Sequence, residues 1–315
     1  MKEKIAFLFP GQGAQYVGMG KDFFEEFAEA KEIFLHADEL LGYSLSTLLF
    51  EGPMEELTKT KHSQLGIFVM SAALLEVFRK NFPDIKPSAC AGLSLGEYSA
   101  IYAAGFLSFE ETLLLVQKRA ELMNEACEKQ QSLMAAVMGL SLEQIKQMIE
   151  PLEEVWVANY NTPDQIVITG SKEGVEKAMT LLQENGAKRV IPLQVHGAFH
   201  SPLMKSAEDS LMPFIEKAPF KESSTPVVMN VNASFTQDVK ELKDTLKKQI
   251  TRSVLWRPTI DAMKQQGITN FLEIGCGKTL SAMNRKIDSS LNSLYLAKVS
   301  DLSKLKEKGD LLNVT

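Results

Sequence analysis

Short apolar runs alternate with longer stretches of helical periodicity along most of the chain, and this pattern predicts an α/β protein. In residues 22–41, for example, apolar side chains recur at the spacing of one amphipathic helix. Helical segments separate the apolar runs, so we expect a mainly parallel sheet with helices between its strands. The runs that predict strands of this sheet are residues 5–9, 88–93, 226–231 and 270–274.

The middle of the chain has a different pattern. We expect a strand at 132–140, a helix capped by Ser141 and ending at 152, strands at 154–160 and 165–170, a helix capped by Ser171 and ending at Gly186, and a strand at 188–195. This β-α-β-β-α-β order is that of a ferredoxin-like unit. We therefore expect a large α/β domain built from residues 1–128 and 197–315, with a small ferredoxin-like α+β subdomain, residues 129–196, inserted into it. A catalytic cleft is expected between the two.

Composition limits the classes of function. The chain has 315 residues, of which 45% are hydrophobic and 23% are charged, and its formal net charge is −6. A net negative chain is not expected to bind nucleic acid or an acidic membrane surface. No cleavable signal and no apolar run of about 20 residues is found, so we expect a cytoplasmic protein without a membrane span. The three cysteines lack both disulfide and zinc spacing and are expected to be buried free thiols; they are Cys90, Cys127 and Cys276.

The candidate chemistry begins with the sequence Gly92-Leu93-Ser94-Leu95-Gly96. It follows a predicted strand and precedes a predicted helix that ends at Gly105, which is the context of a nucleophile elbow. Glycines two positions either side of Ser94 leave room where strand and helix approach most closely. The motif predicts that Ser94 is a nucleophile on an α/β-hydrolase-like sheet; the alternative is a tight structural turn.

A nucleophilic serine needs a base, and the chain has four histidines. His36 lies in the predicted amphipathic helix and His62 in a polar segment, where packing or a position at a helix start is expected. His196 and His200 share a loop rich in Gly and Pro that can carry an imidazole to a distant serine, and we assign His200 as the base. Zinc binding by this pair is not expected, because the intervening glycine disfavours one helix carrying both rings. We expect no metal site.

Six motifs in one order then carry a resemblance over nearly the whole length: the chain resembles the malonyl-CoA:acyl carrier protein transacylases. Leu93 departs from the histidine that is usual in that family, and this difference bears on fine acyl preference. Cys276 stands where proline is common. The motifs are residues 9–15, 92–100, 117–123, 159–163, 197–201 and 271–275.

The resemblance implies roles for further residues. The main-chain N–H groups of Gln12 and Leu95 would form the oxyanion hole, and the second lies at a helix start, where the helix dipole favours negative charge. Arg119 would hold the malonyl carboxylate by two parallel hydrogen bonds, against the alternative of a structural ion pair. The main-chain carbonyl of Gln249 would orient the base in place of an aspartate, unless Gln249 lies on a surface helix. Asn161 would order the thioester or a water, unless it serves only as a turn residue before Pro163.

By this resemblance the chain would transfer a malonyl group from malonyl-CoA to the phosphopantetheine thiol of an acyl carrier protein, through a ping-pong mechanism with a seryl ester. It would do so in fatty-acid synthesis, as a monomer, with no cofactor beyond the coenzyme A thioester that is its substrate. A free-standing acyltransferase of a polyketide assembly line, a serine hydrolase or thioesterase, and a non-catalytic docking subunit remain alternatives. Clustered cations at the cleft rim are candidates for carrier binding: Lys188 with Arg189, and Arg285 with Lys286.

Overall fold

The computed structural model describes residues 4–129, 131–193, 195 and 197–307. Its larger sheet has six strands in the order β10-β9-β1-β2-β7-β8, and all neighbours are parallel except β7 and β8. The mainly parallel sheet of the prediction is therefore confirmed, while the likeness to α/β-hydrolases stays a prediction. The strands are β1 (Ile5–Phe9), β2 (Ala89–Gly92), β7 (Val227–Val228), β8 (Phe235–Thr236), β9 (Asn270–Ile274) and β10 (Asn292–Leu296).

Helices cover both faces of this sheet, because successive side chains of its central strands point to opposite sides. Phe7 and Cys90 face the larger hydrophobic core, which is closed by α5 (Thr60–Asn81), α6 (Gly96–Ala104) and α7 (Phe109–Glu128). Leu8 and Ala91 face a smaller core closed by α12 (Trp256–Gln265) and α13 (Thr279–Ile287). Parallel strands buried on both faces read as continuous apolar runs, which is why β1 was visible in the sequence.

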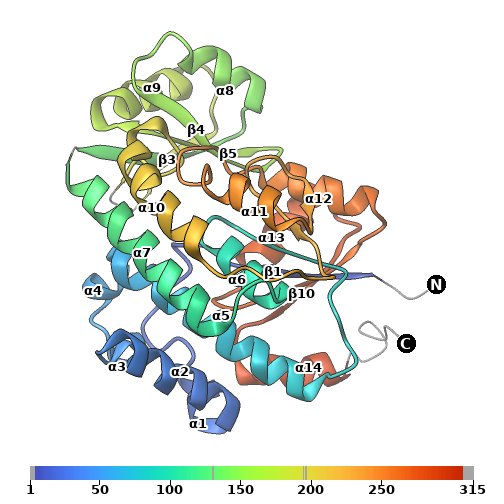
Figure 1. The fold of residues 1–315 in the computed structure, drawn as a ribbon. Helices are drawn as coiled ribbons and strands as arrows, with labels where there is room; N and C mark the ends of the chain where they lie inside the picture. Colours follow the sequence, from blue (N-terminus) through green and yellow to red (C-terminus); the bar gives the residue numbers. More distant parts are fainter. Residues whose placement is uncertain (1–3, 130, 194, 196, 308–315) are drawn as a thin grey trace.

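The second sheet is antiparallel, in the order β4-β5-β3-β6. With α8 and α9 it gives the chain order and the strand order of a ferredoxin-like unit, and it stands at the top of Figure 1 with its own hydrophobic core. The side chains of Ser141 and Ser171 cap the two helices as expected. Its elements are β3 (Ser132–Met138), α8 (Leu142–Ile149), β4 (Val155–Thr162), β5 (Gln165–Ser171), α9 (Lys172–Glu184) and β6 (Arg189–Pro192).

The remaining helices surround the larger sheet (Figure 1). No helix in the described part of the chain is long and apolar enough to cross a lipid bilayer. The helices are α1 (Lys21–Glu26), α2 (Ala28–Leu41), α3 (Leu45–Glu51), α4 (Met54–Thr58), α5 (Thr60–Asn81), α6 (Gly96–Ala104), α7 (Phe109–Glu128), the 3-10 turn η1 (Pro202–Met204), α10 (Lys205–Lys217), α11 (Val239–Leu246), α12 (Trp256–Gln265), α13 (Thr279–Ile287) and α14 (Val299–Glu307).

Some sequence expectations were wrong in detail. The helix expected over residues 22–41 is broken at Phe27, whose backbone is extended, so that α1 and α2 are separate. The strand expected over 226–231 has only two paired residues, because the chain turns back after Val228 and its next strand, β8, pairs with β7. Cys90 and Cys276 are buried free thiols, but Cys127 is only partly buried.

Candidate active site

Ser94 occupies a sharp turn between β2 and α6. Its φ of 54° lies in the left-handed region that non-glycine residues rarely adopt. A Cβ added to Gly92 would lie 1.9 Å from the carbonyl carbon of Gly96, and one added to Gly96 would lie 2.1 Å from the main-chain oxygen of Phe9. The two glycines therefore allow strand and helix to meet at this turn, as the motif predicts.

His200 reaches Ser94 from the segment before η1. Its Nε2 lies 2.8 Å from Oγ of Ser94, and its Nδ1 lies 2.9 Å from the main-chain oxygen of Gln249. A second carbonyl, that of Arg252, lies 3.1 Å from the same Nδ1. Because a carbonyl oxygen only accepts, Nδ1 carries the proton and Nε2 is free to accept from the serine hydroxyl.

The imidazole of His200 is held neutral by its surroundings. Its pKa is lowered from 6.5 to about 4, first by burial and then by the positive charge of Arg119, while the hydrogen bonds to the two carbonyls oppose the shift. A neutral imidazole is the form that can remove a proton from the serine.

Gln249 lies in the turn after α11 and is fully buried, so the surface-helix alternative is wrong. The side chain of Gln249, like its carbonyl, forms hydrogen bonds within the site. Nε2 donates to the main-chain oxygen of Ser94 at 2.7 Å and to Oε1 of Glu97 at 3.0 Å. Its Oε1 accepts from Nη2 of Arg119 at 3.0 Å.

Arg119 projects from α7 and is almost completely buried. Its Nη2 lies 3.1 Å from Oγ of Ser94, its Nη1 donates to Oε1 of Gln64, and its guanidinium carbon lies 5.4 Å from the centre of the Tyr98 ring. All of these partners are uncharged. Within the described residues Arg119 forms no ion pair and its Nε has no hydrogen-bond partner. The alternative of a structural ion pair is therefore not what the structure contains.

A cavity of about 430 Å³ opens over Ser94 and His200, between the end of the parallel sheet and the antiparallel sheet. Asn161 lines it from β4; the Oδ1 of this side chain has no described partner, and its Nδ2 lies 3.5 Å from Oε1 of Gln165. Arg119 does not line the cavity but lies behind Ser94. A larger groove of about 640 Å³ lies against α8 and β4 and contains none of these residues.

One of the two expected oxyanion donors, Gln12, follows β1 and lines the cavity. The other, Leu95, is buried directly after Ser94 and precedes the first residue of α6. Over the residues that the structure describes, neither main-chain N–H donates to a protein acceptor. Gln12 is fixed through its side chain, which donates to Oγ1 of Thr60 at 3.3 Å and accepts from Nε2 of Gln64 at 3.5 Å.

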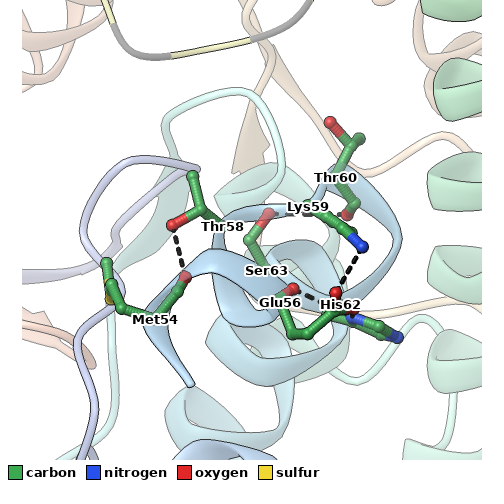
Figure 2. Close-up of polar contacts among 7 residues, drawn as sticks. All are labelled: Met54, Glu56, Thr58, Lys59, Thr60, His62 and Ser63. Atoms are coloured by element: carbon green, nitrogen blue, oxygen red, sulfur yellow. Dashed lines mark hydrogen bonds and ion pairs between the residues drawn. The ribbon is translucent and has the colours of Figure 1, made fainter. Parts of the chain in front are cut away.

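The other described histidines lie away from this cavity. His62 is in the first turn of α5, where its Nδ1 lies 2.9 Å from the main-chain oxygen of Glu56 (Figure 2). This is the helix-start position that the sequence indicated. The same figure shows Met54 and Thr58 of α4, which both line the cavity and are joined by a hydrogen bond of 2.8 Å. His36 lies in α2 beside Glu110. His196 lies outside the described residues.

Sequence reasoning missed three buried polar residues of the site: Gln64, Glu97 and Asn230. Gln64 lies in the second turn of α5, just before its apolar stretch, and Asn230 follows β7 at the same edge of the sheet as Ser94. A polar residue at the end of a buried strand was the available signal for Asn230. Over the described part of the chain, no group of three or more His, Cys, Asp or Glu residues is placed to hold a metal ion.

Comparison with known proteins agrees with this geometry. The model of the acyl transferase domain family matches residues 6–302. A malonyl CoA-acyl carrier protein transacylase from Bacillus subtilis is 42% identical over 315 residues, covering 98% of this chain and 99% of the relative. A polyketide biosynthesis malonyl CoA-acyl carrier protein transacylase from the same strain is 39% identical, covering 92% and 99%.

Solved structures agree as well. A malonyl-transacylase solved in complex with its type II polyketide acyl carrier protein is 35% identical, with a TM-score of 0.93 over 97% of this chain and 100% of that one. The chain therefore belongs to the acyl transferase domain family and, within it, to the malonyl CoA-acyl carrier protein transacylases.

Proposed function

We propose that this protein transfers a malonyl group from malonyl-CoA to the phosphopantetheine thiol of holo acyl carrier protein, in fatty-acid biosynthesis. The observation that carries the proposal is the contact of one serine hydroxyl with both a neutral imidazole and a buried guanidinium: Ser94 with His200 and Arg119. The names of the relatives support the same substrates.

In the first half-reaction His200 removes the hydroxyl proton of Ser94, and Oγ attacks the malonyl thioester carbonyl. The tetrahedral oxyanion accepts hydrogen bonds from the main-chain N–H groups of Gln12 and Leu95, and collapse expels the coenzyme A thiolate, which takes the proton from His200. The carbonyls of Gln249 and Arg252 support this step, because they hold the imidazole in the tautomer that accepts at Nε2. The products are free coenzyme A and a malonyl ester on Ser94.

In the second half-reaction the thiol of the carrier protein's phosphopantetheine arm attacks the ester. His200 takes the thiol proton and returns it to Oγ of Ser94 as the new thioester forms. We propose that residues 129–196 act as a subdomain and that residues 1–128 and 197–315 form the larger domain. The arm would enter through the cavity between these two parts. Asn161 lines that cavity with a buried, unpartnered Oδ1, which supports a role in ordering the thioester.

Arg119 would receive the malonyl carboxylate. A buried guanidinium with uncharged partners can exchange its bond to Oγ of Ser94 for a bond to a ligand carboxylate. We further propose that the turn at Ser94 works as in α/β-hydrolases, and that the protein acts as a cytoplasmic monomer without a metal or a resident cofactor.

The test is product analysis with purified protein, malonyl-CoA and, in separate reactions, holo carrier protein from a fatty-acid system and from a polyketide system. Malonyl carrier protein should form with release of one coenzyme A per transfer. Free malonate as the main product would indicate a hydrolase instead, and transfer only to a polyketide carrier protein would indicate the polyketide alternative.

A further inference from the structure

Glu97 is a completely buried carboxylate beside the candidate nucleophile. It lies in the first turn of α6, three residues after Ser94. Its Oε2 accepts from the main-chain N–H of Asn230 at 2.5 Å, and its Oε1 accepts from Nε2 of Gln249 at 3.0 Å. Both oxygens therefore accept from groups that can only donate at that position, which is the pattern that an ionised carboxylate satisfies.

Asn230 connects this carboxylate to the turn. Its Oδ1 accepts from the main-chain N–H of Ser94 at 2.7 Å, and its Nδ2 donates to the main-chain oxygen of Gly92 at 2.7 Å. The side chain thus bridges the two sides of a turn whose central residue has a positive φ. A strained conformation persists only where its surroundings hold it in place.

Gln249 connects the same carboxylate to the guanidinium. The two N–H groups of its amide point at Oε1 of Glu97 and at the main-chain oxygen of Ser94, and both of these atoms only accept. The amide oxygen must then face the other way, where Nη2 of Arg119 donates to it. The orientation of the Gln249 amide is consequently set by its partners.

The arrangement also places the carboxyl group of Glu97 near Arg119, with the amide of Gln249 between them. Burial raises the pKa of Glu97 to about 8, while the donors Asn230 and Gln249 and the charge of Arg119 oppose that rise. A carboxylate bonded directly to the guanidinium would occupy the edge that a ligand carboxylate needs. A neutral amide between the carboxyl group and the guanidinium leaves that edge available.

We propose that Glu97 is a positioning residue for malonyl selection: through Gln249 it orients Arg119, and through Asn230 it holds the turn of Ser94. This inference rests on the proposed function, in which Arg119 binds the malonyl carboxylate. It predicts that loss of the acceptor pair at Glu97 harms transfer of a charged acyl group more than transfer of an uncharged one.

The variant Glu97→Gln tests this, because it replaces one acceptor oxygen by an NH₂ group of the same size. In either orientation of the new amide, its NH₂ group faces one of the two donors, the main-chain N–H of Asn230 or Nε2 of Gln249. The measurement is the single-turnover rate constant for acylation of Ser94 by malonyl-CoA and by acetyl-CoA, followed by intact mass after acid quench. We expect both rate constants to fall and their malonyl-to-acetyl ratio to fall by about tenfold, as for loss of one buried charge-assisted hydrogen bond.

The chain offers a matched control at Glu273. This carboxylate is also fully buried and accepts from two main-chain N–H groups, those of Leu280 and Ser281 at the start of α13. Glu273→Gln should lower the unfolding temperature as Glu97→Gln does. Its malonyl-to-acetyl ratio should stay at the wild-type value, since Glu273 contacts neither Gln249 nor Asn230.

An unchanged ratio in folded Glu97→Gln would overturn the inference, and so would an equal fall in Glu273→Gln. If Glu97→Gln does not fold, Glu97→Asp decides in the same assay: a shorter carboxylate cannot reach both donors, so its ratio should fall, and a wild-type ratio would overturn the inference. Wild-type protein that accepts neither acyl group, or an Arg119→Ala variant with an unchanged ratio, would instead contradict the proposed function.

Discussion

Ser94 and His200 both have positive φ angles, 54° and 61°, and their side chains meet with Nε2 2.8 Å from Oγ. Two strained residues from segments 106 positions apart in the chain therefore converge on one contact. Backbone strain of this kind costs of order 1 to 3 kcal/mol per residue and is concentrated at functional sites. The rest of the site surrounds this pair with hydrogen bonds that fix it.

Replacing Arg119 by Ala should weaken malonyl transfer far more than acetyl transfer. Only the malonyl group loses a carboxylate partner, so we expect a loss of about 2 to 4 kcal/mol in transition-state stabilisation for malonyl-CoA alone. The measurement is kcat/KM for the two donors. Arg119→Lys keeps the charge but not the planar fork and should fall between wild type and Arg119→Ala. Equal losses for both donors would make Arg119 structural.

The pH dependence of acylation should reflect the lowered pKa of His200, about 4. The neutral base is then present throughout the neutral range, and the acid limb that His200 gives to the rate profile should lie at about pH 4 rather than at 6.5. Because folded His200 binds its proton less tightly than unfolded His200, its contribution to stability is complete above pH 6.5 and is lost as pH falls to about 4.

The measurement is the single-turnover rate constant of acylation by malonyl-CoA as a function of pH. Circular dichroism at each pH shows whether the protein is still folded. Glu97, with a pKa near 8, titrates in another range, so the acid limb should persist in Glu97→Gln. In Arg119→Ala the limb should move to higher pH, because a cation near the imidazole is gone. A midpoint near 6.5 in the wild type would contradict the buried, neutral imidazole.

Much of this architecture could be predicted from the sequence, for identifiable reasons. Buried parallel strands such as β1 read as apolar runs, and serine caps marked both helices of the antiparallel sheet. The break at Phe27 could not be predicted, because apolar periodicity continues across it. β8 and the outer strand β10 were also missed: the first has two residues, and the second begins with two polar residues, Asn292 and Ser293.

The residues of the site also include some that the sequence indicated and some that it did not. Ser94 and His200 were visible because local sequence, glycines around one and a loop around the other, indicated them. The contact of Gln249 with His200 followed only from resemblance, and those of Glu97 and Asn230 were not found, because they depend on segments more than 130 residues apart meeting in space. No local pattern encodes such a contact.

Gly92→Ala should destabilise the protein and abolish acylation. A methyl group there would collide with the backbone of Gly96 and Glu97, so we expect a loss of at least about 3 kcal/mol in the free energy of unfolding. Gly186→Ala is the control: its φ is positive, but no atom lies within 4 Å of the added carbon, so the cost should be about 1 to 2 kcal/mol. Urea unfolding measures both, and equal losses would show that the close approach at Gly92 is unimportant.

Carrier protein binding should depend on Lys188 and Arg189. Both are exposed at β6, on the outer edge of the antiparallel sheet, and neither forms an ion pair with any described residue. Reversing both to Glu should raise the KM for carrier protein and flatten its dependence on salt, because rim charges mainly affect association. Malonylation by malonyl-CoA should stay near the wild-type rate. An unchanged carrier KM at low salt would exclude this patch and direct attention to Arg285 and Lys286.

The most direct test of the account is the intact mass of the protein after mixing with malonyl-CoA, in the wild type and in Ser94→Ala. The wild type should gain the mass of one malonyl group, localised to Ser94 by peptide mapping, and should lose it when holo carrier protein is added. Ser94→Ala should remain folded and gain nothing. A stable malonyl adduct on Ser94→Ala, or wild-type transfer to the carrier protein without an acylated intermediate, would contradict the account.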